Sequence, residues 1–437
     1  MDDRTEQQPN DQGDDLPRRV TRPPLDPDQR YRQALKAIEL LIAAGHAARL
    51  AGGCVRDRLL GEQPKDYDIA TDAHPSAVCH IFEQKHMKVV PTGIEHGTVT
   101  VVIAGQGIEI TTLRKDVSTD GRRATVAFGH SFAEDAARRD FTMNAMYEDH
   151  EGQIYDYHQG YEDLTQGRLR FVGDAKTRIC EDYLRILRLF RFWARFGFAP
   201  DAETLAAVSL NRAGLSIVSQ ERITAEILSL LSEPQVVPVI EAMYQTGILP
   251  MVFKHPLEES VRDDLDAYKS IRKAERSLVR LAALLGRIAK ADDRVDTLHA
   301  LRLSQAQSSR ILSLLDHPTL GKDQAQNMTL LDHQAKIWGN DGLIEVLCPA
   351  WRLLHPGASR EIGHLERLEI DKGARRRTPL PLKGQDLIRK LGLTPGPQLG
   401  DMLEKLKESF RNELWTTAED GLHLARAWLK DSDGTAT

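Results

Sequence analysis

Hydrophobic and polar positions follow two different patterns along the chain, and the change falls at about residue 175. Before it, short apolar runs are bounded by turn-forming residues, which is typical of β-strands mixed with a few helices. After it, apolar residues recur three or four positions apart nearly to the end of the chain, as in 184–192 and 223–231. The pattern therefore predicts an α+β protein in which a sheet region is followed by an all-α region.

The N-terminal region shows one helical pattern followed by five strand patterns. Residues 28–44 keep apolar side chains at helical spacing as far as Gly45. A second helix is expected at about 75–85, between the second and third strands. Because most of the strands are neighbours in the sequence, we expect an antiparallel or mixed five-stranded sheet. The expected strands are 47–52, 67–71, 87–93, 97–103 and 108–114.

Polar segments mark the expected boundaries of the chain's parts. Residues 1–27 are polar and nearly free of apolar side chains, so ordering them would cost entropy without burial, and we expect a disordered tail. Residues 373–381, GARRRTPLP, are predicted to form a basic linker ahead of the last helices. The expected domains are 28–150, 151–215, 216–372 and 373–437.

Composition narrows the class of protein. The chain has 437 residues, enough for about three domains. Its formal net charge of -6 means that a polyanionic partner has to meet a local basic surface. The four cysteines are too scattered for a zinc or disulfide framework and fit a reducing cytoplasm. No stretch is long and apolar enough to cross a membrane, and we expect no signal peptide.

A glycine pair follows the first expected strand, in the segment GGCVRDRLLGEQPKDYDIA of residues 52–70. Gly52 and Gly53 allow the backbone to approach an anion closely because they carry no Cβ. Apolar residues at helical spacing follow, so we expect the pair at a strand-to-helix turn whose N–H groups can hold a phosphate. Arg56 can add a charge-assisted hydrogen bond to the same phosphate.

Two aspartates close this segment. Asp66 and Asp68 flank Tyr67 in what we expect to be a short strand, so both carboxylates should point to the same side. Two adjacent hard oxygen ligands suit Mg²⁺, which takes the rest of its shell from waters and substrate phosphates. Alone, the glycine pair is equally typical of an ordinary turn, and the aspartates of a solvated strand edge. Their combination in one short segment favours a metal-dependent nucleotide site.

The segment resembles the signature of the polymerase-beta-like nucleotidyltransferase superfamily. The wider chain is similar to class II tRNA CCA-adding enzymes and to the related bacterial poly(A) polymerases, through about residues 48–215. The resemblance implies a nucleotidyltransferase head with a five-stranded sheet, followed by an all-α neck, body and tail. Four further stretches carry it: GIEHGTVTVVIAGQGIEITTLRKDVSTDGRRATVAF (93–128), RRDFTMNAM (138–146), YDYHQGYEDLTQGRLRFVGDA (155–175) and EDYLRILRLFRF (181–192).

The resemblance also implies a carboxylate triad. Glu109 matches the acid that joins Asp66 and Asp68 in binding the metal ions that activate the attacking hydroxyl and hold the leaving pyrophosphate. Taken by itself, Glu109 is also typical of the solvated face of an edge strand. The polar, glycine-containing segment 116–128 is expected to be a mobile loop closing a β-hairpin. Enzymes restricted to adding C lack this loop, so its presence implies the complete activity.

The resemblance also implies roles for the segment RRDFTMNAM and for basic residues of the later helices. Arg139 is implied to contact the nucleotide, and Asp140 to help link the head to the next domain. The helices of residues 200–430 are expected to grip tRNA by shape and backbone charge, with basic clusters such as Arg375–Arg377 and Lys383. Those clusters are equally typical of a solvated linker.

The segment 181–191 bears on the choice of nucleotide. If it is helical, Asp182 and Arg185 lie one turn apart on the same face. A row of charged residues along one face of a helix is usually solvated and forms only weak ion pairs. However, cytosine and adenine both present an amino donor beside an acceptor ring nitrogen, which a carboxylate and a guanidinium complement. Guanine and uracil show the reverse order and would leave buried polar groups unpaired, at a cost of roughly 1–3 kcal/mol each.

The resemblance assigns this base-selecting role to the matching Asp182 and Arg185. Arg188 and Arg191 extend the basic stripe and are expected to neutralise the triphosphate or to stack near the base. The acceptor is implied to be an RNA that ends in a 3′-hydroxyl. Protein side chains would then select CTP and ATP without a nucleic-acid template.

The sequence therefore predicts a template-independent tRNA nucleotidyltransferase that builds or repairs the 3′-terminal CCA of tRNA from CTP and ATP, with Mg²⁺ as cofactor. A poly(A) polymerase, or an enzyme that adds only the terminal A, is an alternative within the same chemistry. A catalytically silent RNA-binding module is an alternative of another class, against which Asp66, Asp68 and Glu109 argue. We infer no protein partner and no association with a membrane.

Overall fold

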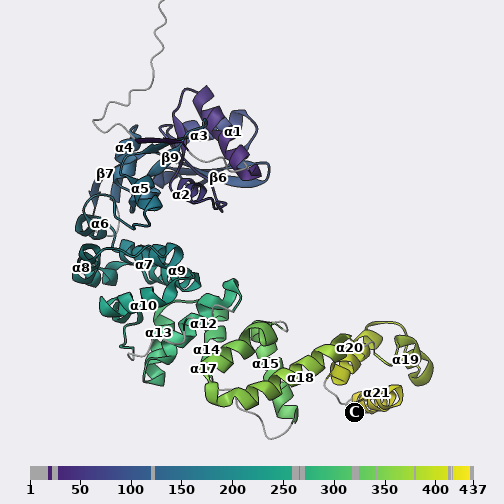
Figure 1. Ribbon diagram of the computed structural model, residues 1–437. Coiled ribbons are helices and arrows are strands. Elements are labelled where there is room, and N and C mark those ends of the chain that lie inside the picture. The colour runs from purple at the N-terminus through teal and green to yellow at the C-terminus, as the bar shows by residue number, and fades with distance from the viewer. Residues whose placement is uncertain are drawn as a thin grey trace, which may run out of the picture. The chain divides into compact units, whose positions relative to one another are not determined.

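The chain forms two compact units, whose helices and strands are labelled in Figure 1. Unit 1 comprises Met1–Asp263 and Arg287–Leu303, and unit 2 comprises Asp264–Gly286 and Ser304–Thr437. The domain boundaries expected at residues 150, 215 and 372 stay predictions. The computed structural model describes residues 18–21, 28–119, 124–257, 265, 271–316, 324–339, 342–377, 380–411, 415 and 417–433.

Unit 1 is built on a mixed sheet of eight strands, where the sequence predicted five. All five expected strands are present, and β1, β9 and β10 extend the sheet beyond β2. Neighbouring strands are antiparallel except β3 and β6, which run parallel with Asp68 paired to Glu109. In sheet order the strands are β1 (Arg18–Thr21), β10 (Gln153–Asp156), β9 (Met146–Glu148), β2 (Ala48–Ala51), β3 (Asp68–Thr71), β6 (Gln106–Thr112), β5 (Thr98–Ile103) and β4 (Lys88–Gly93).

Strand β1 corrects the expectation of a disordered tail. Its four residues pair antiparallel with β10, where Val20 lies opposite Ile154. Ladder hydrogen bonds satisfy the backbone of a segment that has few apolar side chains to bury. The rest of the expected tail, residues 1–17 and 22–27, lies outside the described residues.

Helices α1 (Gln29–Ala43) and α3 (Pro75–Gln84) confirm the two helices predicted before and within the strands. Asp28 caps α1 by accepting a hydrogen bond from the backbone N–H of Tyr31 at 2.6 Å. Helix α1 contacts β2 and β3, and α3 contacts β4, β5 and β6. Fully buried side chains such as Ile38 and Phe82 fill the space between these helices and the sheet.

Strands β7 (Arg114–Thr119) and β8 (Ala124–Phe128) form a separate two-stranded antiparallel hairpin. Most of the segment 116–128, which was expected to be the loop that closes a hairpin, therefore forms the strands of one. Residues 120–123 at its tip lie outside the described residues, so the expected mobile loop stays a prediction. The short helices of the same region are α2 (Gly53–Leu59), η1 (Ile94–His96), α4 (Phe132–Ala137), η2 (Thr142–Asn144) and α5 (Gly160–Thr165).

The remainder of unit 1 is helical, as the change of pattern near residue 175 predicted. The segment 181–191 is not one helix, however, because Asp182 takes an extended conformation with φ -151° and ψ 104° that ends one helix before the next begins. The helices are α6 (Ala175–Glu181), α7 (Leu184–Phe196), α8 (Ala202–Asn211), η3 (Arg212–Ile217), α9 (Gln220–Ser232), α10 (Val236–Gln245), α11 (Ile248–Phe253) and α13 (Ala291–Ala300).

The described residues of unit 2 form helices. Helix α18 continues to Arg377, so the first half of the expected linker 373–381 is helical, and its side chains lie outside the described residues. A small core that includes Leu387, Leu406 and Trp415 holds the last three helices together. The helices are α12 (Lys273–Gly286), α14 (Gln305–Leu315), α15 (Gln324–Trp338), η5 (Leu343–Leu347), α17 (Cys348–Leu354), η6 (Pro356–Ala358), α18 (Ser359–Arg377), α19 (Gly384–Leu391), α20 (Pro397–Arg411) and α21 (Ala418–Asp433).

Candidate active site

The glycine pair lies at the turn from β2 into α2, as predicted. Gly52 has φ 74°, a conformation that side chains disfavour, and its N–H donates to the carbonyl oxygen of Met146 at 3.0 Å. A Cβ on Gly52 would lie 2.6 Å from Nη1 of Arg139. The missing side chain therefore makes room for an arginine, which lines the adjacent cavity.

A cavity of about 460 Å³ lies in unit 1, between the sheet and the helices that follow it. Its walls combine five acidic residues with six arginines. The predicted site residues that line it are Asp68, Glu109, Arg139, Asp182, Arg185 and Arg188; those not proposed as site residues include Arg114, Asp135, Arg138 and Arg222.

Asp68 and Glu109 are brought together at the sheet end of the cavity. They are direct partners in the parallel pair β3 and β6, so their side chains leave the same face of the sheet. Desolvation by the surrounding cavity wall raises the pKa of Asp68 to about 6 although the side chain is exposed, and the neighbouring charge of Glu109 adds to the rise. Two carboxylates held side by side in this way repel each other until a cation or a proton joins them.

Asp66 takes a different position from the one predicted. Strand β3 begins at Asp68, so the alternation of strand side chains does not extend back to Asp66. Asp66 lines a second, smaller cavity, although its charge still contributes to the raised pKa of Asp68. Within the described part of the chain, no cluster of three or more His, Cys, Asp or Glu side chains is arranged to hold a metal ion.

Asp135 holds two arginines on the cavity wall. It accepts hydrogen bonds from Nε of Arg138 at 2.8 Å and from Nη2 of Arg139 at 3.1 Å, and the hydroxyl of Tyr147 donates to it at 2.8 Å. Burial alone would raise the pKa of Asp135, but the two guanidinium groups lower it to about 2. The carboxylate is therefore ionised at neutral pH and fixes both guanidinium groups.

Asp140 and Arg188 form a second fixed pair, between the sheet region and helix α7. Nε of Arg188 donates to Asp140 at 2.8 Å, and the side-chain amide of Asn144 donates to the same carboxylate at 3.1 Å. Burial opposes ionisation of Asp140, but Arg188 outweighs it and lowers the pKa to about 2. This pair supports the predicted link between the head and the next domain.

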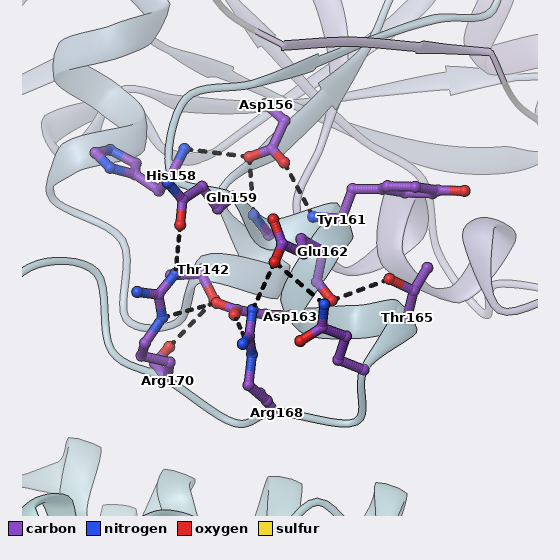
Figure 2. Close-up of polar contacts among 12 residues, drawn as sticks. Thr142, Asp156, His158, Gln159, Tyr161, Glu162, Asp163, Thr165, Arg168 and Arg170 are labelled. Atoms are coloured by element: carbon purple, nitrogen blue, oxygen red, sulfur yellow. Dashed lines mark hydrogen bonds and ion pairs between the residues drawn. The ribbon is translucent and has the colours of Figure 1, made fainter.

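A polar network around Asp163 holds the turn η2 at its first residue, Thr142 (Figure 2). The fully buried Asp163 accepts hydrogen bonds from the hydroxyl of Thr142 at 2.6 Å, from Nε of Arg170 at 2.9 Å and from Nε of Arg168 at 3.0 Å. A Cβ on Gly160 would lie 2.1 Å from the carbonyl oxygen of Thr142, so only glycine lets α5 approach the turn this closely. The network thereby fixes η2 against α5.

Asp182 and Arg185 share the helical end of the cavity, but they do not bond to each other by side chains. The carboxylate of Asp182 accepts from Nη2 of Arg222 at 2.7 Å and from the N–H of Leu184 at 3.1 Å. Arg185 donates to the carbonyl oxygens of Arg178 at 2.8 Å and Arg138 at 3.0 Å. Because Asp182 lies between two helices, its side chain is held by α9 as well as by the backbone of α7.

Two predicted nucleotide-binding arginines lie away from the cavity. Arg56 is buried, and Nε donates to Asp57 at 2.8 Å while Nη1 bonds to the side-chain oxygen of Asn144. Arg191 bonds to Glu226 through Nε at 2.6 Å and lies over the ring of Phe192. In this arrangement both arginines support neighbouring helices, and neither guanidinium lines the cavity.

Sequence reasoning missed four functional candidates, Asp135, Arg138, Arg114 and Arg222. Asp135 stands three residues before Arg138 in FAEDAARRD, and the helical spacing of that segment was a usable signal. Arg114 closes the strand segment IEITTLR and was visible there. Arg222 stands 40 positions after Asp182, and no local sequence pattern predicts that contact.

Comparison with known proteins agrees with this architecture. The family described as "Poly A polymerase head domain" matches residues 48–170, and "Probable RNA and SrmB- binding site of polymerase A" matches residues 197–258. The CCA tRNA nucleotidyltransferase 1, mitochondrial, of Homo sapiens is 34% identical over 90% of this chain and 89% of its own length. The CCA-adding enzyme of Leuconostoc mesenteroides is 34% identical over 87% of this chain and 92% of its own.

A solved structure extends the likeness to the fold. The Bacillus stearothermophilus CCA-adding enzyme in complex with CTP is 29% identical and superposes with a TM-score of 0.65 over 93% of this chain and 98% of that one. The head-domain match and these relatives identify the class of protein as a nucleotidyltransferase. The chain belongs to the family of CCA-adding tRNA nucleotidyltransferases.

Proposed function

We propose that this enzyme adds CCA to the 3′ end of tRNA from CTP and ATP, and that the cavity of unit 1 is its active site. One observation carries the assignment: Asp68 and Glu109, from two paired strands of the sheet, line the same cavity as Asp182 and Arg185, from the helical region that follows. The first pair suits nucleotidyl transfer and the second suits recognition of a base. The family relationship supports the reaction class and the tRNA substrate.

The nucleotidyltransferase family depends on divalent metal ions, and we propose Mg²⁺ as the ion used here. Asp68 and Glu109 fit it, because they offer adjacent carboxylate oxygens whose mutual repulsion a cation would relieve. Asp66 belongs to the same Asp-x-Asp segment and interacts electrostatically with Asp68, so we include it as a third ligand. When bound, the metal would lower the pKa of the attacking hydroxyl and neutralise the leaving pyrophosphate.

The arginines of the cavity wall would hold the triphosphate. Arg138 and Arg139 are fixed by Asp135, so their guanidinium groups need no reorganisation when a phosphate arrives. Arg188, fixed by Asp140, adds a third cation from α7. These contacts would align the α-phosphate for in-line attack by the 3′-hydroxyl of the RNA, with pyrophosphate leaving on the opposite side.

Asp182 and Arg185 would select the base. A carboxylate has about four acceptor positions, more than the bonds from Arg222 and Leu184 use, so Asp182 can still accept from an amino group of cytosine or adenine. Arg185 has five N–H donors, and donors beyond its backbone contacts and its ion pair with Glu181 can reach a ring nitrogen. Arg56 and Arg191 would act by supporting this wall rather than by touching the nucleotide.

The rest of the tRNA would lie on a basic helical surface. Lys383, which is exposed ahead of α19, belongs to the proposed contact surface, together with Arg375–Arg377 at the end of α18. The described helices of both units include none long and apolar enough to cross a membrane. We propose a reducing compartment such as the cytoplasm because all four cysteines are free.

The test is to supply the enzyme with Mg²⁺ and a tRNA that ends just before CCA, add CTP, ATP or both, and sequence the 3′ ends. Addition of CCA followed by arrest is the expected result. Addition of A alone to a CC end would identify an A-adding enzyme. A long A tail would favour the poly(A) polymerase that the head-domain match also names.

A further inference from the structure

Asp182, the residue proposed to contact the base, lies at a break in the helical backbone. Helix α6 ends at Glu181 and α7 begins at Leu184, while Asp182 itself is extended. Because Asp182 does not have a helical conformation, contacts with neighbouring segments set the direction of its carboxylate. The first of these contacts is local: Oδ1 of Asp182 accepts from the backbone N–H of Leu184 at 3.1 Å.

The second contact comes from Arg222, in the first turn of α9. Its Nη2 donates to Oδ2 of Asp182 at 2.7 Å, and both residues line the active-site cavity. The two oxygens of the carboxylate therefore have different donors, one on the backbone of α7 and one on a side chain of α9. Donors on both oxygens fix the plane of a carboxylate, because rotation about the bond from Cβ to Cγ would break both hydrogen bonds.

The backbone beside Asp182 is held by the segment that leads into α9. Gly214, in η3, lies against the ring of Tyr183, and a Cβ on Gly214 would lie 2.0 Å from a ring carbon. The missing side chain lets η3 pack directly on the residue that follows Asp182. Helix α9 begins three residues after η3 ends, and it packs against α7. One stretch of chain therefore holds both the backbone and the carboxylate of the base-selecting residue.

Selection between bases requires an acceptor whose direction is fixed. Cytosine and adenine would place an amino group against Asp182, whereas guanine and uracil would place a carbonyl there. A carboxylate that can rotate could turn away from that carbonyl and let water take its place, which would remove the penalty for the wrong base. A carboxylate that is held in one orientation keeps the penalty.

We propose that Arg222 is a positioning residue for nucleotide selection, which holds the carboxylate of Asp182 in the orientation that accepts from an amino group and rejects a carbonyl. The inference rests on the proposed function, because it takes Asp182 as the residue that contacts the base. Arg222 acts through Asp182 and does not itself hold the triphosphate. Its removal should therefore change the discrimination among nucleotides more than the rate with CTP.

The experiment compares Arg222→Ala and Arg222→Lys with the native enzyme by measuring kcat and KM for each of the four nucleotides, on a tRNA that ends just before CCA. Arg222→Ala should lower the discrimination of CTP from UTP and GTP about fivefold, which is the effect of one hydrogen bond of ordinary strength. The kcat with CTP should stay close to native. Arg222→Lys, which keeps a cationic donor, should restore most of the discrimination.

Glu221→Ala is the matched control. It breaks an ion pair with Arg302 in the same turn of α9, but Glu221 does not line the cavity. Native discrimination is expected in this variant. A loss of discrimination in the control equal to that in Arg222→Ala would overturn the inference, because it would show a general effect of loosening α9.

A double-mutant cycle separates positioning from direct binding. In the Asp182→Ala background, Arg222→Ala should cause no further loss of discrimination, because the carboxylate that it positions is gone. A further loss as large as in the native background would overturn the inference. So would an equal rise in KM for all four nucleotides with unchanged discrimination, which would make Arg222 a triphosphate contact. Failure of the native enzyme to extend the tRNA would instead refute the proposed function.

Discussion

The two ends of the active-site cavity hold their carboxylates in opposite ways. At the sheet end, Asp68 and Glu109 lie side by side, and the pKa of Asp68 is raised to about 6 by desolvation and by its neighbour. At the helical end, Asp140 is paired with Arg188 at 2.8 Å, which outweighs burial and lowers its pKa to about 2. Asp182 is likewise paired with Arg222 at 2.7 Å.

This difference separates the part of the site that needs a ligand from the part that is already complete. A like-charged pair is stable at neutral pH when a cation joins it, so the sheet end depends on a metal ion. The helical end has its counter-charges built in, and it can present donors and acceptors to a base without rearrangement. We therefore assign the chemistry to the sheet end and the choice of nucleotide to the helical end.

The largest effect on activity is expected when a carboxylate is removed from the sheet end. Asp68→Ala or Glu109→Ala should lower kcat by roughly a thousandfold, because metal catalysis is worth several kcal/mol. Asp66→Ala should be equally severe if it is the third ligand. Single-turnover incorporation of CTP measures the loss, and tRNA affinity should stay native. Glu39→Ala, an exposed carboxylate on α1, is the control; near-native kcat in Asp68→Ala would refute the metal site.

A substitution at the helical end is expected to have a smaller effect, on the discrimination among nucleotides. Asp182→Ala removes the acceptor for an amino group, so discrimination against UTP and GTP should fall by about tenfold to a hundredfold, corresponding to roughly 1–3 kcal/mol. The measurement is kcat/KM for each of the four nucleotides. Glu203→Ala, an exposed acid on α8, is the matched control. Native selectivity in the Asp182 variant would contradict selection by protein side chains.

Asp135→Asn tests the residue that fixes Arg138 and Arg139. The amide keeps an oxygen for Tyr147 but loses the charge that holds both guanidinium groups, so the KM for CTP should rise about tenfold. Selectivity among the four nucleotides should not change, because the residue does not face the base. A loss of selectivity equal to that of Asp182→Ala would show that the two ends are not separable.

The smallest predicted effect is one of pH. In the metal-free protein the pKa of Asp68 is raised from 3.8 to about 6, so its ionisation costs stability that is present below about pH 4 and lost as the pH rises through 6. Protons should compete with the metal in the same range. Half-saturation by Mg²⁺ should therefore require about fourfold more metal at pH 5.5 than at pH 7.5. A requirement independent of pH would contradict the coupled carboxylates.

The sequence predicted the parts of the site that depend on local order. Gly52 follows from a turn pattern that is set by neighbours in the chain, whereas Glu109 was placed with Asp68 only through the family resemblance, since their strands are distant in the sequence. Arg56 and Arg191 were assigned to the nucleotide because a sequence shows charge but not direction; the structure pairs them with Asp57 and Glu226.

Contacts between distant segments were beyond the sequence. The three additional strands of the sheet include β1, which has almost no apolar signal and is held by backbone pairing with β10. The break at Asp182 was hidden because the apolar spacing of 184–192 continues a helical pattern that begins before it. Arg222 reaches Asp182 only because α9 packs against α7, which no motif in either segment announces.

One assay can test whether the sheet end carries the chemistry and the helical end the choice of nucleotide. Native enzyme, Asp68→Asn and Asp182→Ala are each given a tRNA ending just before CCA and one of the four nucleoside triphosphates, and single-turnover rates are measured. Asp68→Asn is expected to be slow with every nucleotide but to keep the discrimination of CTP from UTP and GTP. Asp182→Ala is expected to lose that discrimination while retaining far more of the rate. Loss of the discrimination in Asp68→Asn, or its retention in Asp182→Ala, would contradict this assignment of roles.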